Sequence, residues 1–219
     1  MAMKVYGPVA STNVARVLVC LEEIAAEYEV VPVDMTKGEH KSPAHVARNP
    51  FGQVPAFQDG DLILSESRAI CKYILRKGGR SDLLRESNLS ECAMVDVWLE
   101  VEAGQFDTAM SPIVFQCFIV PIFMGGTTDT RVVEENLEKL KKALEVYEAR
   151  LSSSRYLAGD FISFADISHF PMAHYLLAGP HASVVDAYPH VRAWIAGVMA
   201  RPSVKKIREL MKVSSARLN

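Results

Sequence analysis

An α/β domain followed by an all-helical domain is the fold class that the sequence predicts, and three observations lead to it. The apolar pattern of residues 1–80 follows the order β-α-β, loop, β-β-α. Residues 81–90 are polar and no apolar periodicity crosses them, which is typical of a linker. Residues 91–219 have helical periodicity. We therefore expect one domain on each side of this linker.

The first domain is predicted to begin with a strand, a helix and a second strand. Residues 4–6 and 29–34 form the two strands, and Pro32 favours an edge position or a strand end for the second. Between them, Ser11-Thr12-Asn13 is a cluster of N-cap residues ahead of apolar residues at helical spacing. A unit of this kind pairs its strands in parallel through a right-handed crossover.

A hairpin and a helix are predicted next. The X-Pro step at Val54-Pro55 precedes two short apolar runs, and Asp59-Gly60-Asp61 between these runs is typical of a hairpin turn. Ser65-Glu66-Ser67 then precedes apolar residues at helical spacing, so a helix should begin there with unpaired backbone N–H groups. A helix N-terminus is an anion-binding site.

Gln53, Glu66 and Ser67 would come close together if this hairpin forms. The trio suits a small ligand that carries both an ammonium and a carboxylate group. It equally suits a simple helix cap, formed by Glu66 and Ser67, beside a solvated loop residue.

The second domain contains several predicted helices. The clearest covers residues 131–151, and residues 88–108 are periodic through Ala93, Val97, Val101 and Ala103. Pro112 and Pro121 are expected to interrupt or bend the chain after residue 108. Two further helices are expected to begin at Phe164, where residues 163–166 match a capping box, and at Pro189.

Composition excludes several classes of function. With 49% apolar and 23% charged residues, the 219-residue chain can bury a sizeable core. The formal net charge of −2, without long runs of like charge, indicates neither a nucleic-acid nor an anionic-membrane partner. The most apolar stretch, residues 113–124, is too short to span a bilayer, and the N-terminal segment has no signal-peptide pattern. We expect a soluble cytoplasmic protein.

Metal, disulfide and nucleotide sites are not predicted. The four cysteines make no CxxC pair and lie in periodic apolar segments, so buried thiols are expected. His169 and His174 are spaced so that they lie on different faces of a helix. The sequence contains neither GxxxxGK[ST] nor GxGxxG.

Several motifs together resemble the plant phi class of soluble glutathione transferases, over essentially the whole chain. In chain order they are STNVARVL (11–18), GEHKSP (38–43), NPFGQVPA (49–56), DGD (59–61), ESRAI (66–70), YPHV (188–191) with Trp194, and Arg201-Pro202. The resemblance implies a thioredoxin-like domain followed by an all-helical domain. It also implies a homodimeric enzyme that uses reduced glutathione as co-substrate, without a metal or a tightly bound cofactor, to detoxify hydrophobic electrophiles such as herbicides and other xenobiotics.

The resemblance implies that Ser11 activates the thiol of glutathione. A thiol with a pKa near 8.5 is only a few per cent ionised at about pH 7, and lowering that pKa by about two units needs roughly 2.7 kcal/mol. A hydrogen bond to a charged acceptor supplies about 1.5–3 kcal/mol and a helix N-terminus up to about 2 kcal/mol, which together are sufficient. Without the resemblance, Ser11 is better explained as a helix cap.

The resemblance also implies a glutathione-binding set and a hydrophobic-substrate set. The first set is His40 and Lys41 for the glycine carboxylate, Gln53 and Val54 with a cis peptide before Pro55 for the tripeptide backbone, Glu66 for the γ-glutamyl ammonium and Ser67 for its carboxylate. The second set is Thr12, Met35, Phe115, Phe118, Ile119 and Tyr175, each of which could equally be an ordinary core residue. Phe115 and Ile119 are the stronger pair, because their spacing places them on one face of an α-helix. Phe51 would insert into the partner subunit as a dimer contact.

Two other functions stay open at this point. Glutathione-dependent reduction of organic hydroperoxides needs the same thiolate, and the sequence does not separate it from conjugation. A non-catalytic carrier of hydrophobic small molecules would keep the fold, but the presence of Ser11 argues against it. A cysteine-based thiol transferase would need a cysteine at position 11, where the chain has serine.

Overall fold

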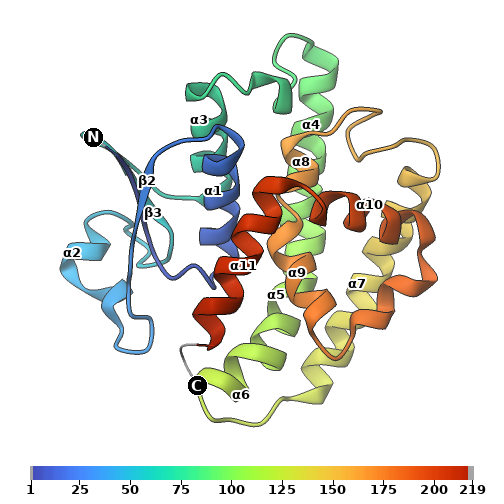
Figure 1. The fold of residues 1–219 in the computed structure, drawn as a ribbon. Coiled ribbons are helices and arrows are strands. Elements are labelled where there is room, and N and C mark those ends of the chain that lie inside the picture. Colours follow the sequence, from blue (N-terminus) through green and yellow to red (C-terminus); the bar gives the residue numbers. More distant parts are fainter. Residues whose placement is uncertain (1, 217–219) are drawn as a thin grey trace. The chain divides into compact units, whose positions relative to one another are not determined.

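The computed structural model describes residues 2–216, with side chains described as far as residue 212. Contacts divide the chain into two compact units (Figure 1). Unit 1 is the segment that ends at Leu84 together with the segment that begins at Arg201, and unit 2 is Arg85–Ala200. The final helix is therefore grouped with the first unit, whereas the division at residues 81–90 stays a prediction.

Unit 1 contains a four-stranded mixed sheet with the order β2-β1-β3-β4. The strands are β1 (Met3–Tyr6), β2 (Tyr28–Val31), β3 (Ala56–Asp59) and β4 (Leu62–Leu64). β1 pairs with β2 in parallel, whereas the β1–β3 and β3–β4 pairs are antiparallel. Gly60 has φ +59° in the β3–β4 turn, as a tight hairpin requires. The predicted β-α-β and hairpin order is confirmed.

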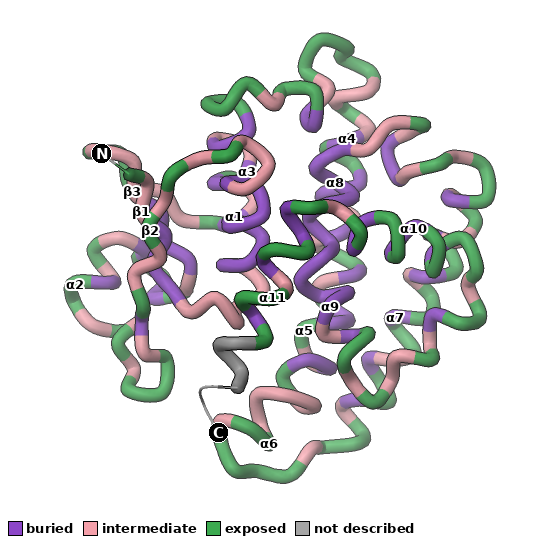
Figure 2. Tube along the Cα trace, viewed as in Figure 1, coloured by how far each residue is buried: buried purple, intermediate pink, exposed green. Residues whose placement is uncertain are grey.

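The helices of unit 1 form its core with the sheet. They are α1 (Thr12–Glu23), η1 (Glu39–Lys41), α2 (Pro43–Val46), α3 (Ser67–Lys77), η2 (Ser81–Leu83) and α11 (Pro202–Ala216). Figure 2 shows α1 buried along most of its length, because it packs against both α3 and α11. Leu83 and Leu84, in the polar stretch of residues 81–90, are also buried, which the polarity of that stretch did not indicate.

Unit 2 is entirely helical among its described elements. They are α4 (Leu89–Val101), η3 (Glu102–Phe106), α5 (Asp107–Val114), η4 (Phe115–Ile119), α6 (Val120–Phe123), α7 (Thr130–Leu151), α8 (Phe164–Ile167), α9 (Phe170–Ala178), η5 (Ala182–Ala187) and α10 (Pro189–Met199). The capping box of Ser163 and Asp166 is present at the start of α8, as predicted. The predicted helices over residues 131–151 and from Pro189 are also confirmed.

The run from α4 to α6 differs from the prediction in two ways. Pro112 and Pro121 do not interrupt it, since the π-helical turns η3 and η4 keep it helical, while the other alternative, a bend at these prolines, stays a prediction. The predicted apolar stripe is wrong: Val97 is 49% exposed, and the buried side includes Val95 and Trp98. Apolar residues occur all around this run, so periodicity alone could not select the buried face.

The same run, Leu89–Phe123, is long enough and apolar enough to cross a membrane by length and composition alone. A core helix of a soluble protein passes the same test, so a single helix of this kind is weak evidence for a membrane span. Residues 113–124 were expected to be too short to span a bilayer. This expectation is wrong, because most of them belong to a 35-residue helix. The absence of a membrane partner stays a prediction.

Candidate active site

Ser11 occupies the N-cap position of α1. Its carbonyl accepts a hydrogen bond from the Ala15 N–H at 2.8 Å, and its own N–H donates to the Pro8 carbonyl at 2.9 Å. Its side chain is partly exposed and makes no capping hydrogen bond. The backbone of Ser11 therefore begins the helix, but its hydroxyl does not cap it. The hydroxyl is thus available to another group.

The start of α3 holds Glu66 and Ser67. Glu66, the exposed N-cap residue, has φ +66° and ψ 103°, a strained conformation for a residue with a Cβ. Ser67 is 5% exposed. Its Oγ accepts a hydrogen bond from Arg16 Nη1 at 2.9 Å and donates to Asn13 Oδ1 at 3.3 Å. The hydroxyl of Ser67 is thus linked to the first turns of α1.

Sequence reasoning missed Asn13 and Arg16. Arg16 is 1% exposed, and its Nη1 donates to Asn13 Oδ1 at 2.5 Å as well as to Ser67. A signal was present, because Arg16 is the charged residue in the otherwise apolar run of residues 14–21. A charge in the middle of a buried helix needs polar partners, and those partners are candidates for a site.

The loop before β3 contains a cis peptide bond between Val54 and Pro55, as the resemblance implied. The Gln53 side chain is exposed, and the Gln53 carbonyl lies 2.8 Å from His45 Nε2 and accepts from Asn49 Nδ2 at 2.9 Å. His45 and Asn49 are both buried. They hold the backbone of this loop in place, and the sequence offered no signal for that role.

His40 and Lys41 lie against this loop. Gly52 has φ +57°, and a Cβ added there would be 2.8 Å from Lys41 Cδ and 2.9 Å from the His40 carbonyl oxygen. Lys41 Nζ donates to the Phe51 carbonyl at 3.0 Å. His40 Nδ1 is buried without a hydrogen-bond partner among the described residues. A buried polar nitrogen of this kind is available to a ligand, because leaving it unpaired is costly.

Gly7 connects the Ser11 turn to the cis-proline loop. It has φ +146°, and a Cβ added there would lie 2.6 Å from Val14 Cγ2 and 3.0 Å from Val54 Cβ. No side chain fits between these two valines. The close approach brings the N-terminus of α1 next to the backbone that precedes Pro55.

The residues predicted for the hydrophobic substrate are divided between the two units. Thr12 and Met35 belong to unit 1, where Met35 is 39% exposed. In unit 2, the rings of Phe118 and Tyr175 meet edge to face with centroids 5.0 Å apart. Phe115 and Ile119 are the first and last residues of the π-helical turn η4, and their pairing at the substrate stays a prediction.

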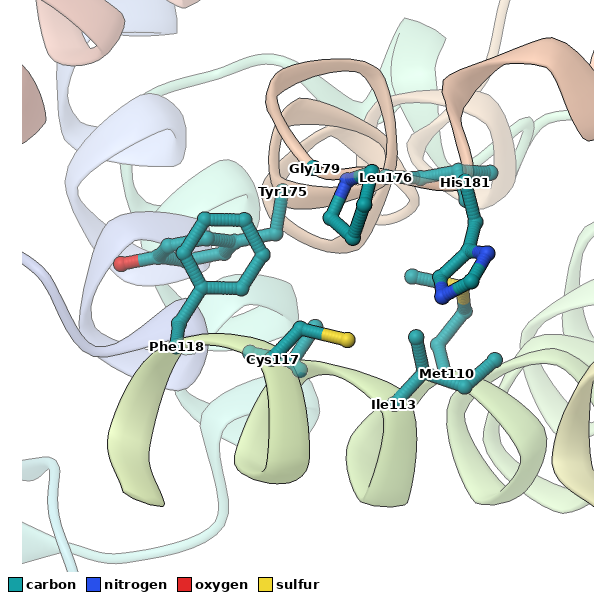
Figure 3. A pocket seen from close by; sticks show the side chains of 10 residues that line it. Met110, Ile113, Cys117, Phe118, Tyr175, Leu176, Gly179 and His181 are labelled. Atoms are coloured by element: carbon teal, nitrogen blue, oxygen red, sulfur yellow. The ribbon is translucent and has the colours of Figure 1, made fainter. Parts of the chain in front are cut away.

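Phe118 and Tyr175 line a small apolar cavity of about 10 Å³ in unit 2 (Figure 3). Ile113 and Cys117, from the α5–η4 run, lie on one side of the cavity, and Tyr175 and Leu176, from α9, lie on the other. Phe115 and Ile119 do not line it. Burial raises the pKa of the Cys117 thiol, so its reactive thiolate form is disfavoured at neutral pH.

We searched residues 2–216 for side chains that could bind a metal ion together. No group of three or more His, Cys, Asp or Glu side chains there could hold a metal ion.

Comparisons with known proteins identify the family. The glutathione S-transferase N-terminal domain matches residues 1–76, and the C-terminal domain of the same family matches residues 106–202. The chain is 63% identical over 216 residues to probable glutathione S-transferase GSTF1 of Oryza sativa subsp. japonica, covering 98% of this chain and 99% of the relative. It is 61% identical over 213 residues to glutathione S-transferase 1 of Zea mays, covering 97% and 99% respectively.

Solved structures agree with the sequence comparisons. Glutathione S-transferase I bound with lactoylglutathione has a TM-score of 0.91 at 60% identity and covers 96% of this chain and 100% of that chain. Glutathione S-transferase I from maize in complex with an atrazine glutathione conjugate also has a TM-score of 0.91 at 60% identity, with 97% and 99% covered. These matches confirm the predicted fold class, a thioredoxin-like domain followed by a helical domain. The chain therefore belongs to the glutathione S-transferase family and is an enzyme of the plant phi class.

Proposed function

We propose that this enzyme conjugates reduced glutathione to hydrophobic electrophiles, including herbicides and other xenobiotics, and that Ser11 activates the thiol. The supporting observation is the Ser11 hydroxyl, which stands at the N-terminus of α1 without a capping hydrogen bond. The solved complex of the maize enzyme with an atrazine glutathione conjugate supports the substrate class. In the reaction the thiolate sulfur forms a bond to an electrophilic carbon, and the leaving group departs with its bonding electrons.

Unit 1 carries the proposed glutathione site. The unpaired Nδ1 of His40 and the ammonium of Lys41 suit the glycine carboxylate. The backbone of Gln53 and Val54, held before Pro55, suits the peptide groups of glutathione. Glu66 and Ser67 at the start of α3 suit the γ-glutamyl ammonium and carboxylate.

Replacing Ser11 by alanine is expected to lower kcat/KM for conjugation to a small activated aryl halide ten-fold or more, a loss of about 1.4 kcal/mol or more. The hydroxyl would no longer stabilise the thiolate, so the pKa of the bound thiol should rise toward its free value near 8.5. The rate profile against pH should shift to higher pH accordingly. Ser152→Ala, an exposed serine in unit 2, is the matched control.

Two results would contradict this assignment. If Ser11→Ala keeps the wild-type rate and pH profile, another group activates the thiol. If the wild type binds glutathione but does not exceed the uncatalysed rate with any electrophile, a non-catalytic carrier becomes the favoured function.

Replacing Gly7 by alanine is expected to weaken glutathione binding and to lower the free energy of unfolding by about 1–3 kcal/mol, because the new methyl group overlaps Val14 and Val54. Gly60→Ala is the control: it also has positive φ, but its added Cβ would meet no atom within 4 Å. Calorimetric titration with glutathione separates the two variants. If Gly7→Ala binds glutathione as tightly as Gly60→Ala does, the close contact at Gly7 does not shape the site.

A homodimer in the cytoplasm completes the proposal, with Phe51 as a contact to the partner subunit. Phe51 is 71% exposed in the single chain, on the loop that carries Gly52 and Gln53. Buried aromatic anchors at interfaces cost several kcal/mol when truncated, roughly 2–4. Phe51→Ala should therefore sediment as a monomer at protein concentrations where the wild type is dimeric, and unchanged sedimentation would remove Phe51 as a dominant anchor.

A further inference from the structure

The buried guanidinium of Arg16 lies between the N-terminal turns of two helices. We propose that Arg16 is a positioning residue that holds the Ser67 hydroxyl ready to donate to the γ-glutamyl carboxylate of glutathione. The inference rests on the proposed glutathione site and adds to it a residue that does not touch the ligand.

The contacts of Arg16 join segments that are distant in the chain. Its Nη1 donates to Asn13 Oδ1, three residues earlier on α1, at 2.5 Å. The same nitrogen donates to Ser67 Oγ, which is 51 residues away at the start of α3, at 2.9 Å. With 1% of Arg16 exposed, water screens neither contact. The orientation of Ser67 is therefore set by a charge on another helix.

The hydrogen bonds of Ser67 leave its proton available. A hydroxyl offers one proton and two lone pairs, and Arg16 occupies one lone pair. The proton points to Asn13 Oδ1 at 3.3 Å, a long contact to an oxygen that already accepts from Arg16. A carboxylate would be a stronger acceptor than this amide oxygen. The hydroxyl can thus turn its proton from Asn13 to a bound carboxylate while Arg16 keeps the oxygen in place.

The charge on Arg16 strengthens this donation. A hydroxyl oxygen that accepts from a cation is polarised, which makes its own proton a better donor. Ser67 is also the first residue of the 11-residue helix α3, whose first N–H groups have no partner inside the helix. A carboxylate bound there would meet the hydroxyl and the positive end of the helix together.

A merely structural link between α1 and α3 would have different consequences. It would hold the two helices together whatever the ligand, so its loss would affect all glutathione analogues equally. A positioning role concerns one carboxylate only. The affinity of a ligand without that carboxylate should not change when Arg16 is replaced.

The test compares two ligands by calorimetric titration of the full-length protein. The ligands are glutathione and γ-aminobutyryl-cysteinyl-glycine, which lacks only the γ-glutamyl carboxylate. Arg16→Met removes the donors, and we expect a rise of about ten-fold or more in the Kd for glutathione, with a change of about two-fold or less for the analogue. Arg16→Lys keeps the charge but replaces the planar guanidinium, whose Nη1 makes both contacts, by a shorter side chain with a single ammonium, so a smaller loss with the same selectivity is expected.

Arg16→Lys decides the question if Arg16→Met does not fold. In a Ser67→Ala background, Arg16→Lys should cause no further loss of glutathione affinity, because the group through which Arg16 acts is gone. Equal losses for both ligands, no loss for either, or additive losses in the double variant would overturn the proposal. This test measures binding without turnover. Its result therefore does not depend on whether the Ser11 experiment shows conjugation.

Discussion

Replacing Glu23 by glutamine is expected to lower the free energy of unfolding by about 3 kcal/mol at neutral pH. Glu23 ends α1, and its side chain is 5% exposed. It accepts from Arg201 Nε at 3.0 Å and Nη2 at 2.7 Å, and from the hydroxyl of Ser203. Arg80 Nη1 donates to it at 3.3 Å. Glutamine would leave the guanidinium of Arg201 without its counter-charge, whereas Arg80 would keep its ion pair with Asp82.

The effect should depend on pH with a defined sign. Burial alone would raise the pKa of Glu23, but the hydrogen bonds from Arg201 and Ser203 and the charges of Arg201 and Arg80 outweigh it and lower the pKa. A folded-state pKa below the unfolded value means that the carboxylate stabilises the fold above the unfolded pKa of about 4.3. This contribution is lost as the pH falls through the lowered folded pKa. The difference between wild type and Glu23→Gln should therefore shrink in acid.

Equilibrium urea unfolding at one protein concentration, near pH 7 and at intervals below about pH 4, measures both expectations. Glu29→Gln is the matched control, because Glu29 pairs with Lys4 at 3.5 Å with both side chains exposed. That substitution should cost less than about 1 kcal/mol. If Glu23→Gln costs no more than Glu29→Gln, Glu23 does not hold the segment of Arg201 and Ser203 against α1.

Replacing Asp166 by alanine is expected to be the most destabilising change in unit 2, by about 3–5 kcal/mol. Oδ1 accepts from the Leu157 N–H and from Trp194 Nε1, each at 3.0 Å. Oδ2 accepts from the N–H and the hydroxyl of Ser163, each at 2.8 Å. Alanine would leave buried donors from three segments without an acceptor. Each unsatisfied donor costs about 1–3 kcal/mol.

Urea unfolding of Asp166→Ala beside Asp160→Ala tests this expectation. Asp160 is exposed and accepts a single backbone hydrogen bond, from the Arg155 N–H at 3.0 Å. Its loss should change the free energy of unfolding by about 1 kcal/mol or less. Because the Trp194 indole N–H donates to Asp166, the fluorescence of Trp194 should also change in Asp166→Ala at low urea. Equal unfolding midpoints for the two variants would mean that the network around Asp166 contributes little.

The order of elements could be predicted because each depends on neighbouring residues. The hairpin was predicted from the turn at Gly60, and the start of α8 was predicted from the pair Ser163 and Asp166. Helix α7 needed one apolar stripe, whose members Leu140, Leu144 and Tyr147 are buried as expected. Signals of this kind lie within a few residues of one another, so a single sequence contains them completely.

The candidate site could be predicted only in part, and the division has a physical basis. The chain itself identified Ser11 and Ser67 as residues that begin helices, and the resemblance assigned them roles. Only the tertiary structure showed that the Ser11 side chain does not cap α1. Only the tertiary structure showed that Ser67 is bonded to Arg16, since that contact joins positions 51 residues apart.

The long helix from α4 to α6 is the counterpart in unit 2. Its helical character over residues 88–108 was predicted from the sequence, whereas its continuation through Pro112 and Pro121 was not. Which face is buried, and where the π-helical turns η3 and η4 fall, was decided by packing against the rest of unit 2. Local preferences thus specify the elements of this protein, while the partners of Arg16, Glu23 and Asp166 arise only when distant segments meet.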